Sequence, residues 1–173
     1  MQFTEGNDGG VSSNQFLKLK DKDKVSGVFR GEIHHFKQHW ENQKSSVCPG
    51  KDTCEKCKAG NKAAFRFRLN FILKDAATNE LTSKIFEQSW GTYLDLKTLH
   101  ESGYELDKHF VSISRAGTGQ ATRYTVIPLP KGQLTELQEK NASVVKLQDL
   151  VNLDEASGPK GDNPPPFDDD IPF

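Results

Sequence analysis

The nine residues Phe-Arg-Phe-Arg-Leu-Asn-Phe-Ile-Leu at positions 65–73 constrain the fold most. One set of alternate positions is apolar: Phe65, Phe67, Leu69, Phe71 and Leu73. The other set begins with Arg66, Arg68 and Asn70. An alternation with a period of two is typical of a β-strand. An apolar face and a polar face indicate that one side packs on a core and the other faces solvent. We therefore predict a half-buried sheet with arginines on its open face.

Four more segments predict strands, at residues 25–36, 83–90, 110–114 and 124–127. Gly27 and Gly31 interrupt the first of them, which is typical of a bulge or bend. A short helix is predicted after residue 90, because Thr92 and Asp95 have capping-box spacing and Gly103 is a natural stop. Three strands, a helix and two strands is the element order of the OB-fold. We predict an all-β, five-stranded OB-fold barrel with the helix between strands 3 and 4.

Composition divides the chain into three parts. Residues 1–15 are polar and predict a flexible arm, and residues 16–153 hold the predicted strands. Residues 134–141 predict a final helical turn, and residues 144–153 are apolar enough to pack back on the domain. Residues 154–173 carry a net charge of −5, against +4 for the rest, and predict a disordered acidic tail. The sequence shows neither a secretory signal nor an apolar run that could span a bilayer, so we expect a cytoplasmic protein.

A polar excursion at about residues 39–62 interrupts the predicted barrel between strands 1 and 2. It contains His39, Cys48, Cys54 and Cys57, the last two in a Cys-x-x-Cys arrangement. Three thiolates and one imidazole are a ligand set that suits zinc in a closed, structural site. His35 and His34 remain alternatives for the fourth ligand. The other interpretation of the cysteines is free thiols or an oxidised Cys54–Cys57 pair.

Cations and aromatic rings interleave along the predicted strands and loops. Single-stranded nucleic acids are bound by cations that follow the phosphates and by rings that stack on the bases. The candidate residues are Phe36, Lys37, Trp40, Arg66, Arg68, Lys84, Phe86, Trp90, Arg115, Arg123 and Tyr124. Phe86 is equally compatible with the core, Trp90 with a cap on the barrel, and Arg66 and Arg68 with a merely solubilising face.

The end of the chain combines an acidic run with an apolar hook. Its residues are Asp168, Asp169, Asp170, Ile171, Pro172 and Phe173. A protein partner with a basic rim and an apolar slot could hold the carboxylates and the terminal ring together. The plainer interpretation, an acidic tail that aids solubility, does not explain the terminal aromatic residue.

These residues resemble two groups of proteins. Residues 168–173 are similar to the acidic tip of bacterial single-stranded DNA-binding proteins. The His–Cys–Cys-x-x-Cys insertion after a long first strand resembles that of zinc-containing bacteriophage single-stranded DNA-binding proteins, and so does the segment 112–119 followed by Thr122 and Tyr124. The body lacks likeness to the bacterial protein's own DNA-binding domain, so a tetramer is not implied.

The resemblance implies a non-enzymatic, sequence-tolerant protein that coats single-stranded DNA in replication, recombination and repair. It also implies that residues 168–173 recruit host or phage replication and repair enzymes, with Pro172 and Phe173 in the partner's pocket. The alternatives are a zinc-dependent nuclease or nucleotide hydrolase, a protein-interaction adaptor that uses the zinc loop, and a strand-annealing protein. The sequence leaves open monomer or dimer, and DNA or RNA.

Overall fold

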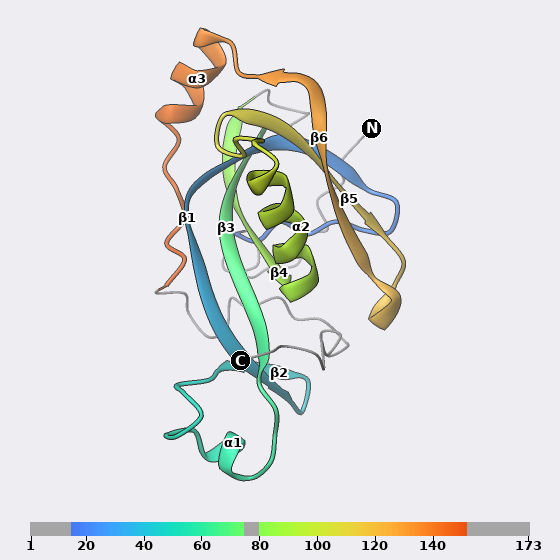
Figure 1. Ribbon diagram of the computed structural model, residues 1–173, viewed down its shortest axis with the longest axis vertical. Coiled ribbons are helices and arrows are strands. Elements are labelled where there is room, and N and C mark those ends of the chain that lie inside the picture. Colours follow the sequence, from blue (N-terminus) through green and yellow to red (C-terminus); the bar gives the residue numbers. More distant parts are fainter. Residues whose placement is uncertain (1–14, 75–79, 152–173) are drawn as a thin grey trace.

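The computed structural model describes residues 15–74 and 80–151 (Figure 1). Its main feature is an antiparallel sheet with the strand order β4-β3-β1-β5-β6, to which a short strand, β2, is added through β1. The strands are β1 (Lys24–Glu41), β2 (Lys44–Val47), β3 (Ala64–Lys74), β4 (Leu81–Ser89), β5 (His109–Ala116) and β6 (Arg123–Gln133). The helices are α1 (Glu55–Lys58), α2 (Trp90–Glu101) and α3 (Glu136–Ser143), with a 3-10 turn, η2 (Gly119–Ala121). All five predicted strands are therefore present, and the helix lies where it was predicted.

The predicted closure of the sheet into a barrel is not confirmed. Among the described residues no ladder joins β4 to β6. The free edge of β4 is taken instead by the segment before β1, where Phe16 bridges Ile85 and the Leu17 N–H donates to the Ile85 carbonyl at 2.9 Å. Side chains still span the two end strands, because the Phe86 and Tyr124 rings lie 6.1 Å apart. The sheet is thus curled around a shared core without being closed by its backbone.

Aromatic rings from three neighbouring strands fill the concave side of the sheet. Phe29 lies 5.1 Å from Phe71 and 5.6 Å from Phe86, measured between ring centroids. Phe67 contributes from the same face of β3, and α2 adds Leu96. The predicted apolar face of residues 65–73 is therefore the core face. The sequence is compatible with Phe86 either at the DNA surface or in the core, and its complete burial assigns it to the core.

Strand β1 is longer than predicted and bends sharply. Gly31 has φ +79°, and the register with β3 shifts between Arg30 and His34. This confirms the predicted bulge at Gly31, whose positive φ a glycine adopts without strain. Gly27 lies in regular ladders with β3 and β5 and marks no bulge. Beyond the bend the strand continues to Glu41, because β2 pairs with it through a two-residue turn of Asn42 and Gln43. Both turn residues have positive φ, the geometry of a type I′ hairpin.

Helix α2 begins earlier than its predicted cap. Its N-cap residue is Ser89 and its first residue is Trp90, so Thr92 is a buried helical residue and the predicted capping box at Thr92 is wrong. The end was predicted correctly, since Gly103 follows the helix with φ +91°. The predicted helix near residues 134–141 is α3, which Thr135 caps together with Gln138.

Residues 144–151, which we call the C-terminal strap, lie on the convex side of the sheet. With α3 they cover Val28 and Ile72 through Ala142 and Val145. Asn70 donates to the Gln148 carbonyl at 3.1 Å and accepts from the Gln148 N–H at 2.9 Å. The predicted open face of β3 is therefore covered at Asn70. Figure 1 shows the strap as the trace that follows α3 along the outer side of β1.

Within the described ranges, none of the helices combines the length and the apolar character needed to cross a membrane. Two predictions fall outside these ranges: most of the N-terminal arm at residues 1–15, and the acidic tail at residues 154–173 with its tip.

Candidate metal centre and nucleic-acid face

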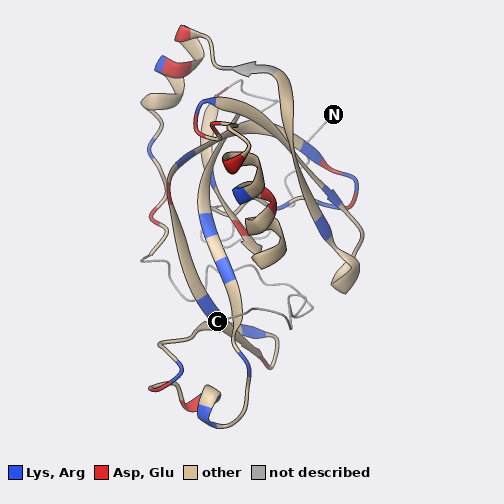
Figure 2. Cartoon of the chain, viewed as in Figure 1, with Lys and Arg blue, Asp and Glu red and all other residues tan. Residues whose placement is uncertain are grey.

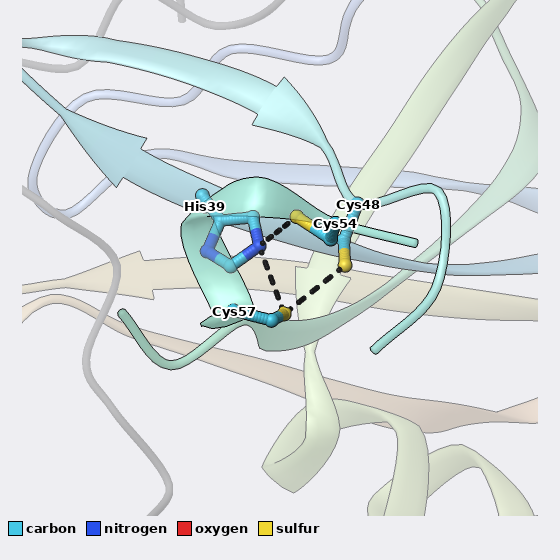
Figure 3. Close-up of side chains that lie close together, drawn as sticks. All are labelled: His39, Cys48, Cys54 and Cys57. Carbon is cyan, nitrogen blue, oxygen red and sulfur yellow. Dashed lines mark hydrogen bonds between the residues drawn. The ribbon is translucent and has the colours of Figure 1, made fainter. Parts of the chain in front are cut away.

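Four side chains meet at the lower end of the molecule, below the sheet in Figure 1 (Figure 3). His39 comes from β1, Cys48 follows β2, Cys54 precedes α1 and Cys57 lies within it. Their ligand atoms all lie within 4.8 Å of one another. The His39 Nε2 is 3.2 Å from the Cys54 Sγ and 3.4 Å from the Cys57 Sγ, and the Cys48 and Cys57 sulfur atoms are 3.6 Å apart.

The backbone around Gly50 builds this cluster. Gly50 has φ +130°, and its carbonyl accepts from the Cys54 N–H at 2.8 Å, which turns the chain into α1. A single helical turn then places Cys54 and Cys57 on one side. Cys48 is fixed by its N–H, which donates to the Lys37 carbonyl at 2.7 Å.

The spacing of these atoms fits a tetrahedral ion. With bonds of about 2.3 Å to sulfur and about 2.0 Å to nitrogen, zinc would hold two sulfurs about 3.8 Å apart and a sulfur and a nitrogen about 3.5 Å apart. The observed contacts are close to these edges. The three cysteines form no disulfide, so the alternative of an oxidised Cys54–Cys57 pair is not observed.

The thiols of Cys54 and Cys57 differ in acidity. The Cys57 backbone N–H lowers the pKa of Cys54, whereas burial and the two neighbouring thiols raise the pKa of Cys57 to about 11. Binding of a metal ion by the Cys57 sulfur would therefore displace a proton at neutral pH. The cluster could hold a metal ion, and its ligand set is consistent with zinc.

The histidine of the cluster is His39, and neither His34 nor His35 belongs to it. His39 is 2% exposed. His34 stacks on Phe36 instead, and His35 contacts Phe65 and Tyr93. The expectation that His39 begins the loop is wrong in one respect, because it lies inside β1, paired with Ser46.

The predicted nucleic-acid residues do not form one surface. Phe36, Trp40, Arg66 and Arg68 share the convex face of β1 and β3, because positions 36 and 40 have the same parity and Phe36 pairs with Arg66. The Arg68 guanidinium lies 4.1 Å above the Phe36 ring. We call Phe36, His34, Trp40, Arg66 and Arg68 the Phe36 face. Figure 2 shows basic positions on β3 and the adjacent part of β1, above the metal cluster.

The arginines of the Phe36 face are paired, although the sequence predicts that they lie on an open face. Arg68 donates to Glu87 at 2.8 Å and also to the Leu150 carbonyl at 3.2 Å, and it is buried. Arg66 reaches the same carboxylate at 3.3 Å. Two cations thus share one anion. Burial lowers the pKa of His34, and the positive charges of Arg68 and His35 add to the shift.

Two predicted residues, Lys37 and Trp90, lie on the opposite side of the β1–β3 ribbon. Lys37 pairs with Phe65, which contacts the Trp90 ring at 4.8 Å. Lys84 pairs with Phe71 on the core face of the sheet, so its prediction for the nucleic-acid surface disagrees with its placement.

The remaining three candidates lie at the end of the β5–β6 hairpin. Arg115 donates to the Leu19 carbonyl and to Thr122, so much of its donor capacity serves the fold. Arg123 is exposed beside η2 and donates to the Gln120 carbonyl at 3.3 Å. Burial raises the pKa of Tyr124, whose ring packs on Phe86.

The sequence interpretation missed four residues that the structure brings to these surfaces: His34, His35, Glu87 and Tyr93. Only Glu87 gave a usable signal. It lies directly opposite Arg68 in the antiparallel β3–β4 ladder, where opposite charges form cross-strand pairs. Comparisons of the chain with protein-family models, curated proteins and solved structures find no match.

Proposed function

We propose that this chain is a non-enzymatic, sequence-tolerant single-stranded DNA-binding protein. The observation that carries the proposal is the Phe36 face, where an arginine lies over an aromatic ring and two arginines share one carboxylate. One positive charge remains uncompensated within this triad. Cations beside ring faces are the combination that single strands need.

The strand order supports the same proposal. In the order of the chain, the five long strands are arranged 3-2-1-4-5, as in an opened OB-fold. OB-folds bind oligonucleotides on the face of their second and third strands and with the loops that flank it. The second strand here is β3, which carries Arg66 and Arg68.

We further propose that the metal is zinc and that its role is structural. Four protein ligands leave no coordination position for a reacting water. A zinc ion at this site would link β1 to α1 through its ligands and would thereby order the polar loop beside Trp40. A zinc-dependent enzyme is the competing proposal, and a chain that degrades DNA only when zinc is bound would support it.

The acidic tip supports a second interaction. Its residues, 168–173, lie outside the described residues, so the proposal rests on their sequence alone. Three carboxylates and a terminal phenylalanine suit a basic, apolar pocket on a replication or repair enzyme of the host or phage. Deleting residues 168–173 should abolish capture of such enzymes and leave affinity for single-stranded DNA equal or higher.

The decisive experiment is a titration of single-stranded DNA, duplex DNA and RNA at several salt concentrations. We expect tightest binding of single-stranded DNA, with log K falling by about 0.7 per neutralised phosphate per decade of salt. Phe36→Leu should weaken binding of oligo-dT about 5- to 150-fold, the loss of one stacked base. Ile127→Ala, which shortens an exposed apolar side chain on β6 rather than on β1 or β3, is the control.

Two results would contradict the proposal. No binding of oligo-dT at low salt would favour a protein-interaction adaptor. Equal affinities of wild type and Phe36→Leu would remove the Phe36 face from the binding surface. Faster pairing of complementary strands in the presence of the protein would identify an annealing activity with the same chemistry.

A further inference from the structure

Four rings gather on the side of the β1–β3 ribbon opposite the Phe36 face. Trp90 stacks on Tyr93 with 5.2 Å between centroids and a 27° angle, and it meets Phe65 edge-on at 4.8 Å. His35 closes the group, 5.0 Å from Tyr93. We call Phe65, Trp90, Tyr93 and His35 the Trp90 cluster.

The Trp90 cluster lies above a core that is already filled. Phe67, its nearest core neighbour, is fully buried, 5.7 Å from the Tyr93 ring. Phe65, Trp90 and Tyr93 are only partly buried, and His35 is exposed. Gly91, beside Trp90, is exposed and has open space where a Cβ would lie. The core therefore does not need all of this aromatic surface, and part of it faces solvent.

The charge on this side suits a polyanion. Lys37 pairs with Phe65 in the ladder and so projects from the same face of β1. His35 has the same parity. The two faces of the ribbon therefore each combine rings with basic groups, and consecutive residues 34–37 of β1 alternate between them.

A route between the two faces is available along one edge of β1. That edge pairs with β5 as far as Gly27 and with β2 from Gln38 onward. In the part of the chain that the structure describes, no strand pairs with it between these points. Ile33 and His35, which lie in this interval, are both exposed.

We propose that the Trp90 cluster is a second base-stacking site, which takes a nucleobase of the same DNA strand that binds the Phe36 face. The strand passes around the unpaired edge of β1 and stacks one base on each side of the ribbon. This inference rests on the proposed function, because it extends the DNA path from one face to two.

The chain has two tryptophans, one on each face, so tryptophan fluorescence can monitor DNA binding at each face separately. Trp40→Phe leaves Trp90 as the only tryptophan, and Trp90→Phe leaves Trp40. Both changes keep a ring and its packing. In a titration of the Trp40→Phe protein with oligo-dT, we expect the fluorescence of Trp90 to be quenched as the DNA binds.

Affinity gives an independent readout. Trp90→Leu removes the ring but keeps an apolar side chain, and it should weaken oligo-dT binding about 5- to 150-fold, whereas Trp90→Phe should stay near wild type. Leu94→Ala, at an exposed position of the same helix, is the matched control and should bind normally.

The outcomes separate the two proposals. If the wild type does not bind oligo-dT, the proposed function fails. If the wild type binds but Trp90 is not quenched, and Trp90→Leu binds as tightly as Leu94→Ala, then the second site is refuted and the Phe36 face remains. Quenching of Trp90 with weakened binding of Trp90→Leu supports a strand that contacts both faces.

Discussion

Among the described residues, Glu87 is the carboxylate that pairs with both arginines of the Phe36 face, so Glu87→Gln tests the charge argument directly. Its side chain is only 2% exposed, and those of Arg66 and Arg68 are 11% and 9% exposed. The substitution keeps the shape and one acceptor but removes the negative charge. Two nearly buried guanidinium groups are then left without a counter-ion.

The expected loss of stability is about 3 kcal/mol. Breaking a buried ion pair by removing one partner costs about 3–5 kcal/mol. The lower end applies here, because the glutamine oxygen still accepts one N–H and the Leu150 carbonyl keeps its bond to Arg68. For a folded part of this size, about 3 kcal/mol lowers Tm by about 6–12 °C. Thermal or urea unfolding followed by circular dichroism measures this loss.

DNA binding should change in the opposite direction. Without the Glu87 carboxylate, the positive charge of both guanidinium groups is uncompensated at the Phe36 face, so Glu87→Gln should bind oligo-dT more tightly than wild type. The slope of log K against log salt should steepen by about 0.7 for each additional phosphate that the arginines neutralise. A less stable protein that binds DNA more tightly is a result that general loss of structure does not produce.

The control is Glu101→Gln. Glu101 pairs with Lys97 on the exposed side of α2 at 3.7 Å, and such surface pairs contribute about 0–1 kcal/mol. If Glu87→Gln were as stable as Glu101→Gln and bound DNA with an unchanged salt slope, the shared ion pair would have no bearing on either property.

Three further predictions concern the rest of the fold. Removal of the metal by a chelator, or Cys57→Ser, should make residues 42–62 sensitive to protease, while β3 stays protected by the core. Mass spectrometry of the fragments identifies the cleavage sites, and a first cut within the core would contradict this prediction. The hydrogen bond from Arg30 holds the pKa of Glu139 below its ordinary value of 4.5. The Arg30–Glu139 pair therefore stabilises the fold fully above pH 4.5, and this stabilisation is lost as the pH falls through the lowered pKa. Hydrogen exchange in α3 should therefore accelerate in that acidic range, and Glu139→Gln should remove the pH step. Gly27→Ala should lower the free energy of unfolding in urea by about 1–3 kcal/mol, because the new Cβ overlaps the β3 backbone and the Phe71 ring. The control is Gly91→Ala, whose Cβ has no neighbour within contact distance; it should be neutral or stabilise the protein by up to about 1 kcal/mol.

Features that depend on local pattern were predictable from the sequence. The alternation at residues 65–73 identified the core face of β3, because side-chain direction in a strand follows from parity alone. Gly31 marked the bulge of β1, and the Cys-x-x-Cys spacing marked the metal cluster. The strand face and the bulge are decided by residues that lie within a few positions of one another. The cysteines are recognisable because few functions other than metal binding require thiols at this spacing.

Features that depend on distant partners were not predictable in the same way. Arg68 is predicted on an open face because its own strand carries no sign of the C-terminal strap. The strap follows about 80 positions later, and only its contacts decide that Arg68 and Asn70 are buried. The sheet is open for a similar reason, since Phe16, far from β4 in sequence, bridges the β4 edge that closure of a barrel would need.

The metal loop has a consequence for how this domain can change over time. Gln38 and Ala64 face each other in the β1–β3 ladder, so the loop between them begins and ends at one point of the sheet. Between these positions only His39 and Cys54 are buried, and both belong to the metal cluster. The loop thus contributes only these two side chains of the cluster to the buried interior, and none to the core of the sheet. A two-residue turn could replace the whole insertion and leave a continuous β1–β3 hairpin, so the loop is a cassette that could be gained, lost or transplanted as one unit.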